Sequence, residues 1–155
     1  MPVTMSTKRV ATVKCHCGAV TGSFSYDASG GEDERPLILQ APWDCNCSDC
    51  AMRRNTHLVI PSSDFTNTTD DYETKTTLYL WGTKTAIRRF CATCGILPWY
   101  VPRSNPDGIG LTVPCIDWGS SCDVPPKIEY NSFDGQNWEE QIKSSKIVDE
   151  SKSKA

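Results

Sequence analysis

Cys91-Ala-Thr-Cys94-Gly95 is the stretch that decides the fold, because it places two thiols on one short turn closed by a glycine. Such a turn supplies two of the four ligands of a tetrahedral zinc ion, and the small residue lets backbone amides point at the sulfurs. We expect the other two ligands to be Cys15 and Cys17, which flank a histidine near the start of the chain. The sequence therefore predicts a zinc ion enclosed by four thiolates.

A third group of cysteines, Cys45-Asn-Cys47-Ser-Asp-Cys50, has no fourth cysteine beside it. Four thiolates close a structural zinc site, whereas three leave one coordination position for water or a substrate. We therefore predict a second zinc ion, with an open position at which chemistry can take place. Cys115 and Cys122 lie outside the clusters. We expect the first to be a small buried side chain and the second an exposed, oxidisable thiol.

Composition limits the class of protein. The chain has 155 residues, enough for one domain with a hydrophobic core. No apolar run approaches the length of about 20 residues that spans a bilayer, and residues 1–13 lack the apolar segment of a signal peptide. Nine cysteines in such a chain favour metal binding in a reducing compartment over disulfides. We expect a cytoplasmic protein, with the nucleus as the alternative.

Charge argues against a nucleic-acid partner. The formal net charge is -3, from 16 basic and 19 acidic residues, and the isoelectric point is about 5.3. Thiolate-bound zinc makes the local charge more negative, whereas a nucleic-acid site usually shows as a basic patch. We expect no membrane or nucleic-acid partner and a small-molecule thiol as ligand; the oligomeric state does not follow from the sequence.

Short segments that alternate apolar and polar residues, or that are rich in β-branched and aromatic residues, predict strands. They are separated by turns that contain Gly, Pro, Asn or Asp. The expected strands are residues 8–13, 19–26, 58–60, 76–81, 86–90, 96–101 and 109–113.

One helix is expected near the end of the chain. Trp138, Gln141 and Ile142 recur at helical spacing, and Ser132 or Asp134 could cap the helix.

The expected fold is therefore mostly β: a compact single domain of short antiparallel strands built around zinc, with this one short C-terminal helix. We place the domain at residues 8–143, with flexible ends at 1–7 and 144–155. The Gly- and acid-rich stretch 27–35 is expected to be an exposed loop.

The order of the motifs resembles a known family. CxC, CxCxxC and CxxCG follow one another, and Phe133-Asp-Gly-x-x-Trp138 closes the pattern. This order is similar to that of the glutathione-dependent formaldehyde-activating enzymes and their relative, centromere protein V, over Cys15 to about Lys143. Four stretches look closer to the centromere protein V branch: residues 47–50, 54–61, 100–108 and 115–117.

The resemblance implies a compact β fold around two zinc ions, the division that ligand counting also gives. It implies a structural zinc held by Cys15, Cys17, Cys91 and Cys94, and a catalytic zinc held by Cys45, Cys47 and Cys50. The activity that it implies is that of a carbon–sulfur lyase on S-(hydroxymethyl)glutathione, which founding members form from glutathione and formaldehyde.

Few residues are available for proton transfer. His57 lies seven positions after Cys50. It could act as acid or base, as a fourth metal ligand or as a donor to a thiolate; the alternative is a packed, hydrogen-bonded histidine. His16, between two structural ligands, is expected to be held there by its backbone, and Asp49 to cap amides of its loop.

Arg53 and Arg54 directly follow the group of three cysteines. They could bind the carboxylates of glutathione, because Arg binds carboxylates in bidentate fashion; the alternative is that they balance the anionic site or face water. The weaker candidates for the same role are Arg88, Arg89 and Arg103. Trp99 and Tyr100 could wall a pocket, although aromatic residues beside such a turn more often pack in the core.

The open zinc site together with the resemblance implies a zinc-dependent carbon–sulfur lyase that acts on a thiol adduct, such as S-(hydroxymethyl)glutathione or a related glutathione conjugate. The alternative is a non-catalytic binding module, stabilised by zinc, that recruits a protein or chromatin partner. A long basic extension outside the zinc domain would favour that module, and this chain has none. An enzyme of the same zinc type with a different electrophile stays open.

Overall fold

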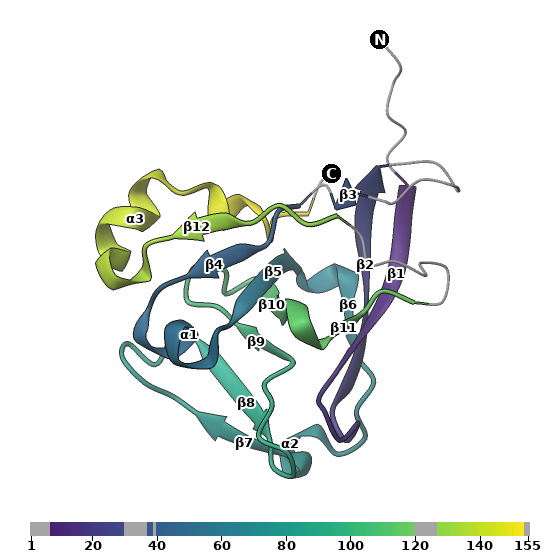
Figure 1. Ribbon diagram of the computed structural model, residues 1–155. Helices are drawn as coiled ribbons and strands as arrows, with labels where there is room; N and C mark the ends of the chain where they lie inside the picture. The colour runs from purple at the N-terminus through teal and green to yellow at the C-terminus, as the bar shows by residue number, and fades with distance from the viewer. Residues whose placement is uncertain (1–6, 30–36, 39, 120–126, 154–155) are drawn as a thin grey trace.

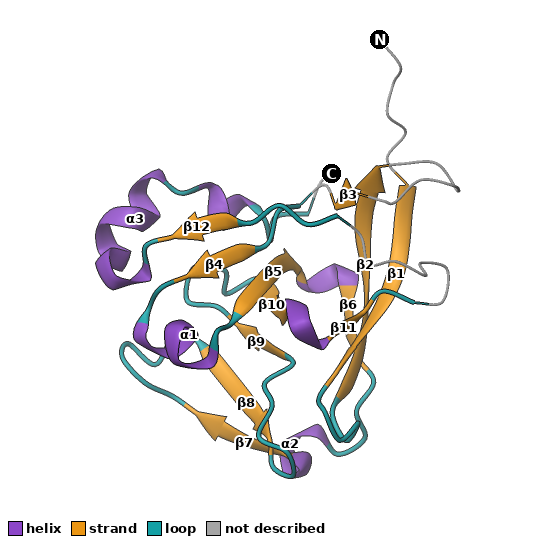
Figure 2. Cartoon of the chain, viewed as in Figure 1, coloured by secondary structure: helices purple, strands orange, loops and turns teal. Residues whose placement is uncertain are grey.

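The computed structural model describes residues 7–29, 37–38, 40–119 and 127–153 (Figure 1). Strands dominate it, as predicted, and they form two sheets (Figure 2). The strand order of the first sheet is β11-β1-β2-β3, and β6 also pairs with β2. Its strands are β1 (Thr7–Lys14), β2 (Thr21–Ser29), β3 (Leu37–Ile38), β6 (Phe65–Asn67) and β11 (Ile116–Asp117).

The second sheet has the strand order β12-β4-β5-β10-β9-β8-β7. All its neighbours are antiparallel except β12 and β4, which run parallel. Its strands are β4 (Trp43–Cys45), β5 (Thr56–Pro61), β7 (Thr76–Tyr79), β8 (Ile87–Cys91), β9 (Trp99–Val101), β10 (Gly108–Thr112) and β12 (Asn131–Phe133).

Strand β5 joins the two hydrophobic clusters of the core. Its side chains from His57 to Pro61 are all buried, which is typical of a strand covered on both faces. Leu58 and Ile60 pack in the larger cluster with residues of β1 and β2. Val59 points the other way, into a smaller cluster that contains Cys45, Cys50 and residues of the C-terminal segment.

Strand β2 shows the alternation that predicted it, because every second side chain is buried. It continues past its expected end at Tyr26 to Ser29, so residues 27–29 of the predicted loop belong to the strand. Asp27 and Ala28 pair with Lys8 and Thr7 of β1, and Ala28 is fully buried. The remainder of the predicted loop, residues 30–35, lies outside the described residues.

The helices are short, and the sequence predicted one of them. They are α1 (Ser48–Arg53), α2 (Tyr72–Lys75) and α3 (Trp138–Ser144). Helix α3 is the predicted C-terminal helix, but its N-cap residue is Asn137 rather than Ser132 or Asp134. Ser132 belongs to β12, and Asp134 precedes a 3₁₀ turn at Gly135–Asn137. In the described part of the chain, no helix is long and apolar enough to cross a bilayer.

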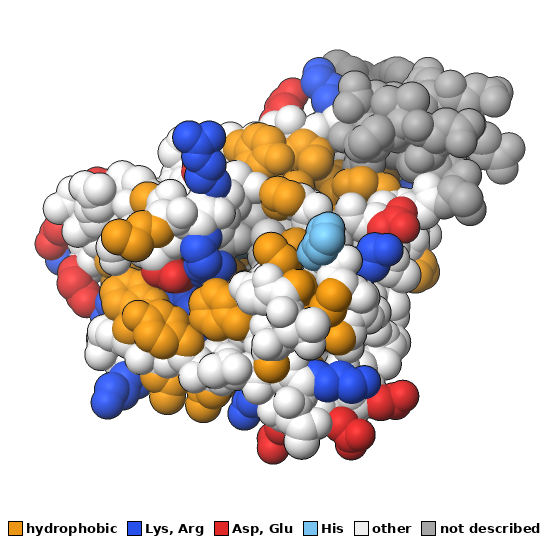
Figure 3. All heavy atoms as spheres, turned by 60° about the horizontal axis from the view of Figure 1, so that its bottom comes forward, with side chains coloured by type: hydrophobic (Ala, Val, Ile, Leu, Met, Phe, Trp, Pro, Cys, Tyr) orange, Lys and Arg blue, Asp and Glu red, His pale blue; other side chains and the backbone are white. Residues whose placement is uncertain are grey.

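The edge of the second sheet is apolar. Strand β7 ends the strand order, and its side chains Leu78 and Tyr79 are 45% and 49% exposed. Figure 3 turns the lower side of Figure 1 forward, the side on which β7 and β8 lie, and shows hydrophobic side chains gathered there.

The described part of the C-terminal segment is packed, in contrast to the flexible end predicted from residue 144. A 3₁₀ turn at Lys146–Asp149 carries the buried side chain of Ile147. Asn105, which is fully buried, donates its Nδ2 to the Ile147 carbonyl at 2.9 Å and to the Ser151 hydroxyl at 2.8 Å. These bonds tie the segment to a loop more than 40 positions earlier in the chain, so local composition does not reveal them.

Replacing Asn105 with Ala should release this segment. The variant leaves the buried Ile147 carbonyl without its donor, so we expect the free energy of unfolding to fall by about 2–4 kcal/mol. Urea denaturation followed by circular dichroism measures the change. Asn131→Ala, at an exposed position of β12, is the control and should change the free energy of unfolding by less than about 0.5 kcal/mol. Equal losses in both variants would show that Asn105 does not secure the segment.

Candidate functional site

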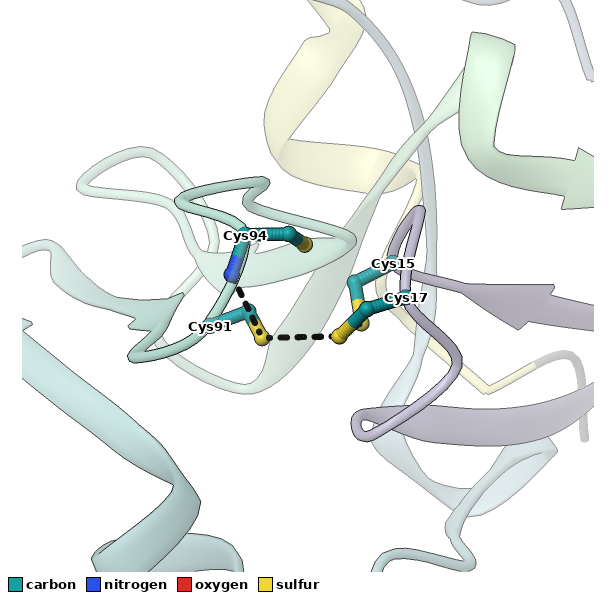
Figure 4. Close-up of side chains that lie close together, drawn as sticks. All are labelled: Cys15, Cys17, Cys91 and Cys94. Carbon is teal, nitrogen blue, oxygen red and sulfur yellow. Dashed lines mark hydrogen bonds between the residues drawn. The ribbon is translucent and has the colours of Figure 1, made fainter.

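Four cysteines converge where the two sheets meet. Cys15 and Cys17 follow β1 of the first sheet, whereas Cys91 ends β8 of the second sheet and Cys94 lies in the turn after it. Their sulfur atoms all lie within 4.8 Å of one another, and Figure 4 shows the two pairs facing each other. Cys17 Sγ is 3.6 Å from both Cys15 Sγ and Cys91 Sγ. Zinc–sulfur bonds of about 2.3 Å in a tetrahedron require about 3.8 Å between sulfurs, so this cluster fits zinc.

Backbone amides surround these sulfurs. Val20 donates its amide to Cys15 Sγ at 3.3 Å, and Cys94 donates its amide to Cys91 Sγ at 3.5 Å. Gly95 has φ of +77°, a conformation that L side chains rarely adopt, which explains the glycine in the motif. Burial raises the pKa of Cys94, but hydrogen bonds from the amides of Cys17 and Ile96, together with those from the thiols of Cys91 and Cys17, lower that pKa to about 6. The turn therefore favours the thiolates that a metal ion needs.

Cys45, Cys47 and Cys50 form the second cluster, with sulfur atoms that also lie within 4.8 Å of one another. Cys45 ends β4, and Cys47 is the N-cap residue of α1, where its sulfur accepts the Cys50 amide at 3.4 Å. The thiols of Cys45 and Cys50 lower the pKa of Cys47 by donating to its sulfur, and the positive charge of Arg88 lowers it further. The structure thus brings together the three cysteines that were predicted to form one site.

Helix α1 was not predicted, because we interpreted residues 45–50 as a loop. It is six residues long, and a cysteine caps it in place of the usual Ser, Thr, Asp or Asn. The sequence therefore lacks the capping pattern from which this helix could have been predicted. The helix matters to the site because Cys50 lies in its first turn and is buried.

Gly135, from the closing Phe-Asp-Gly-x-x-Trp motif, packs directly against Cys45 and Cys47. A Cβ atom on Gly135 would lie 2.6 Å from Cys45 Sγ and 2.7 Å from Cys47 Cβ, closer than side-chain carbons approach other atoms. Phe133 of β12 pairs with Cys45, and Asp134 accepts a hydrogen bond from Asn46 Nδ2 at 3.0 Å. In the sequence this motif indicated only the family; in the structure it closes one side of the site.

A cavity of about 220 Å³ opens beside these three cysteines, which form part of its lining. The other lining residues are His57, Trp81, Gly82, Thr83, Ala86, Arg88, Tyr100, Pro102, Arg103, Ser104, Phe133, Gly135, Trp138 and Ile147. In the described residues, three buried side-chain nitrogens have no hydrogen-bond partner. Two of them, His57 Nδ1 and Trp81 Nε1, belong to this lining. Such nitrogens are costly to bury unpaired, so they indicate a polar ligand.

His57 lies on β5 and is buried, with its ring edge-to-face on Tyr100 at 5.5 Å between ring centres. Burial lowers its pKa to about 4, so the ring is neutral at pH 7. It is packed, as the alternative interpretation expected, but its Nδ1 lacks the hydrogen bond that this interpretation also expected. It does not belong to the group of mutually close ligand atoms, which consists of the three cysteines alone.

The arginines are arranged differently from the prediction. Asp49, expected to cap amides, instead accepts hydrogen bonds from Arg53 Nε at 2.9 Å and Arg88 Nε at 2.7 Å. Arg53 is thereby held on α1, and Arg54 is exposed at the helix end with φ of +49°. Neither lines the cavity, whereas Arg88 and Arg103 do. Adjacency to the cysteines in sequence therefore does not place Arg53 or Arg54 in the lining of this cavity.

The other candidates lie elsewhere. Trp99 is buried in the larger core cluster, and His16 is exposed beside the four-cysteine cluster. Cys115 is half-buried against the same core, and burial raises its pKa to about 11. Cys122 lies outside the described residues.

Comparison with known proteins agrees with this arrangement. Residues 10–132 match the family described as "Glutathione-dependent formaldehyde-activating enzyme". The match contains all seven clustered cysteines and His57. It does not separate the centromere protein V branch from the rest of the family. Among solved structures, the chain is similar to a crystal structure of a Rhodobacter sphaeroides protein, with 28% identity and a TM-score of 0.55. The alignment covers 77% of this chain and 99% of that one.

The two cysteine clusters should respond differently to mutation. Cys91→Ser removes a ligand that joins the sheets, so we expect an unfolded domain; Cys47→Ser should leave a folded protein that binds about one zinc ion per chain instead of two. Metal analysis and circular dichroism measure both properties. Equal unfolding of the two variants would contradict the division into a structural and an open site.

Gly135→Ala should damage the three-cysteine cluster selectively, because its new methyl group collides with Cys45 and Cys47. We expect metal content to fall by about one ion per chain, with the four-cysteine cluster still loaded. Ser132→Ala, at an exposed position of β12, is the control and should keep full metal content. Full loading of Gly135→Ala would show that the close approach does not constrain the cluster.

Proposed function

Because the chain belongs to the family of glutathione-dependent formaldehyde-activating enzymes, we propose that it is a zinc-dependent carbon–sulfur lyase. Its substrate would be a thiol adduct, such as S-(hydroxymethyl)glutathione or a related glutathione conjugate. The observation that carries this proposal is the cavity at the three cysteines, which also contains two unpaired buried nitrogens. A purely structural ion needs no such cavity, so the non-catalytic binding module is less well supported.

We propose zinc at both clusters. Cys15, Cys17, Cys91 and Cys94 would hold the structural ion, and Cys45, Cys47 and Cys50 the catalytic one. When bound at the three cysteines, zinc would act as a Lewis acid that favours the thiolate form of a substrate sulfur. These donors fit that role, because three cysteine sulfurs leave a tetrahedral ion one position for an outside ligand.

His57 is the proposed proton-transfer residue. Joining a thiol to an aldehyde requires a proton at the former carbonyl oxygen, and the reverse reaction removes it. The neutral ring of His57 lines the cavity, and its unpaired Nδ1 can exchange a proton with a bound molecule. Tyr100, whose ring packs against His57, also lines the cavity; burial raises its pKa, so its hydroxyl stays protonated.

Arg103 replaces Arg53 and Arg54 as the proposed anchor for a glutathione carboxylate. Its guanidinium lies 3.7 Å from the centre of the Trp138 ring, and it donates to Glu139 at 2.7 Å. About a third of its side chain is exposed, so it stands at the rim of the cavity, where a long substrate leaves the site. Reduced glutathione and free thiols fit a reducing compartment such as the cytoplasm.

Exchange spectroscopy tests the activity directly. With glutathione and formaldehyde, zinc-loaded protein should accelerate the interconversion of free thiol and S-(hydroxymethyl) adduct, because the cysteines and His57 assist both directions. Cys47→Ser should return the rate to the uncatalysed value. His57→Gln should keep its zinc and lose about 10²-fold in rate.

The controls use the same spectra. Cys115→Ser, outside both clusters, should retain the wild-type rate. An unaccelerated exchange with fully zinc-loaded wild type would exclude this adduct as the substrate. Unchanged activity of His57→Gln would remove the proton-transfer role from that residue.

A further inference from the structure

Arg88 is a buried, positively charged residue that lines the cavity beside the three cysteines. We propose that Arg88 binds the anionic oxygen of the reacting adduct, the oxygen bonded to the carbon that the substrate sulfur attacks. The site would thus take molecules that carry a thiol and, two or three bonds from its sulfur, a negatively charged oxygen. This inference rests on the proposed function, because it places the substrate sulfur at the three cysteines.

Three contacts hold the guanidinium of Arg88 in place. Its Nε donates to Asp49, which lies between Cys47 and Cys50 on α1, at 2.7 Å. Its Cζ also lies 5.3 Å from the centre of the Trp81 ring and 5.1 Å from that of Tyr100. The residue is 5% exposed. A guanidinium fixed in this way is prearranged for a ligand, so little rotational freedom is lost on binding.

The remaining donors of Arg88 have no partner in the part of the chain that the structure describes. A guanidinium carries five N–H groups, and the hydrogen bond to Asp49 uses only the one on Nε. The four others are not among the fully buried unpaired nitrogens, and they belong to a residue that lines the cavity. Donors that stay accessible at a cavity and lack a protein acceptor can bind a ligand oxygen that accepts two hydrogen bonds.

The charge of Arg88 is also incompletely balanced. Asp49 is the carboxylate that pairs with it, and Asp49 pairs with Arg53 as well. One carboxylate thus serves two guanidinium groups, which leaves about one positive charge for other anions. An anionic oxygen bound beside Arg88 would pair with this guanidinium.

The reaction places negative charge on such an oxygen. When a thiolate sulfur attacks an aldehyde, its electron pair forms the carbon–sulfur bond, and the π pair of the carbonyl moves to oxygen. The oxygen then takes a proton and becomes the hydroxyl of the adduct; cleavage runs the same steps in reverse. The charge on oxygen is greatest between these states, so Arg88 would stabilise the transition state more than either end state.

Arg89 offers a matched control on the same strand. Its side chain is absent from the cavity lining, donates to Thr76 Oγ1 at 3.3 Å and lies 5.9 Å from the centre of the Tyr72 ring. Replacing either arginine with Met removes one positive charge from β8, but only Arg88→Met removes it from the cavity.

Two small thiols test the proposal by binding alone. Thioglycolate carries a carboxylate on its thiol-bearing carbon, and 2-mercaptoethanol carries a neutral hydroxyl oxygen at the same separation of three bonds from sulfur. Zinc-loaded wild type should bind thioglycolate about 10-fold or more tightly than 2-mercaptoethanol, because hydrogen bonds to a charged group contribute strongly. Isothermal titration calorimetry measures both dissociation constants, and metal analysis after each titration verifies the zinc content.

Arg88→Met should remove this preference, whereas Arg89→Met should keep it. Arg88→Lys retains the charge without the planar fork and should keep part of the preference, which guards against a Met variant that folds poorly. A preference that persists in Arg88→Met, or a wild type that binds both thiols equally, would overturn the role of Arg88 and leave the lyase proposal intact. Failure of wild type to bind either thiol would count against the lyase proposal itself.

Glutathione separates the two possible sources of the anionic oxygen. If Arg88 instead binds a distant carboxylate of glutathione, Arg88→Met should weaken glutathione binding and leave the ratio between the two small thiols unchanged, which overturns the proposal. If Arg88 binds the reacting oxygen, Arg88→Met should lower kcat for adduct formation by about 10²-fold, while the KM for glutathione changes little.

Discussion

The four sulfurs of Cys15, Cys17, Cys91 and Cys94 join two sheets that also share the larger hydrophobic cluster. Each sheet consists largely of short strands, and one pair of cysteines comes from each. Four thiolates this close repel one another unless a cation lies between them. The orientation of the sheets, and with it the position of every residue carried by β5 and β8, therefore depends on that charge balance.

The cavity also depends on contacts between residues from three separate parts of the chain. Helix α1 supplies Asp49, strand β8 supplies Arg88, and the segment after β12 supplies Gly135. Asp49 links the first two by a buried ion pair between the cysteine loop and the cavity wall. A buried pair of this kind does more to fix geometry than to add stability, because desolvation offsets most of its attraction.

The sequence predicted those features whose chemistry is local. The spacing of the cysteines indicated both clusters, since few other patterns bring so many thiols together, and alternation indicated β2 over most of its length. It did not indicate α1, whose cap is a cysteine, or the packing of Ile147, which depends on Asn105 more than 40 positions away. Arg53 was chosen for its position beside Cys50, but one helical turn directs it to Asp49. Arg88 lies on β8, and the folding of the second sheet places this strand beside the cysteines. The spacing of residues in the sequence does not show this proximity.

The packing of Ile147 into the cavity wall sets an order for biosynthesis. All seven clustered cysteines precede this residue in the chain and are made before it, so a nascent chain can bring both cysteine clusters together while the cavity still lacks one side. At about 5–20 residues per second, that interval lasts seconds. During this interval the three-cysteine cluster is exposed to cellular thiols and metal ions, because the cavity wall that contains Ile147 is incomplete. Chaperones or rapid completion of translation would limit that exposure.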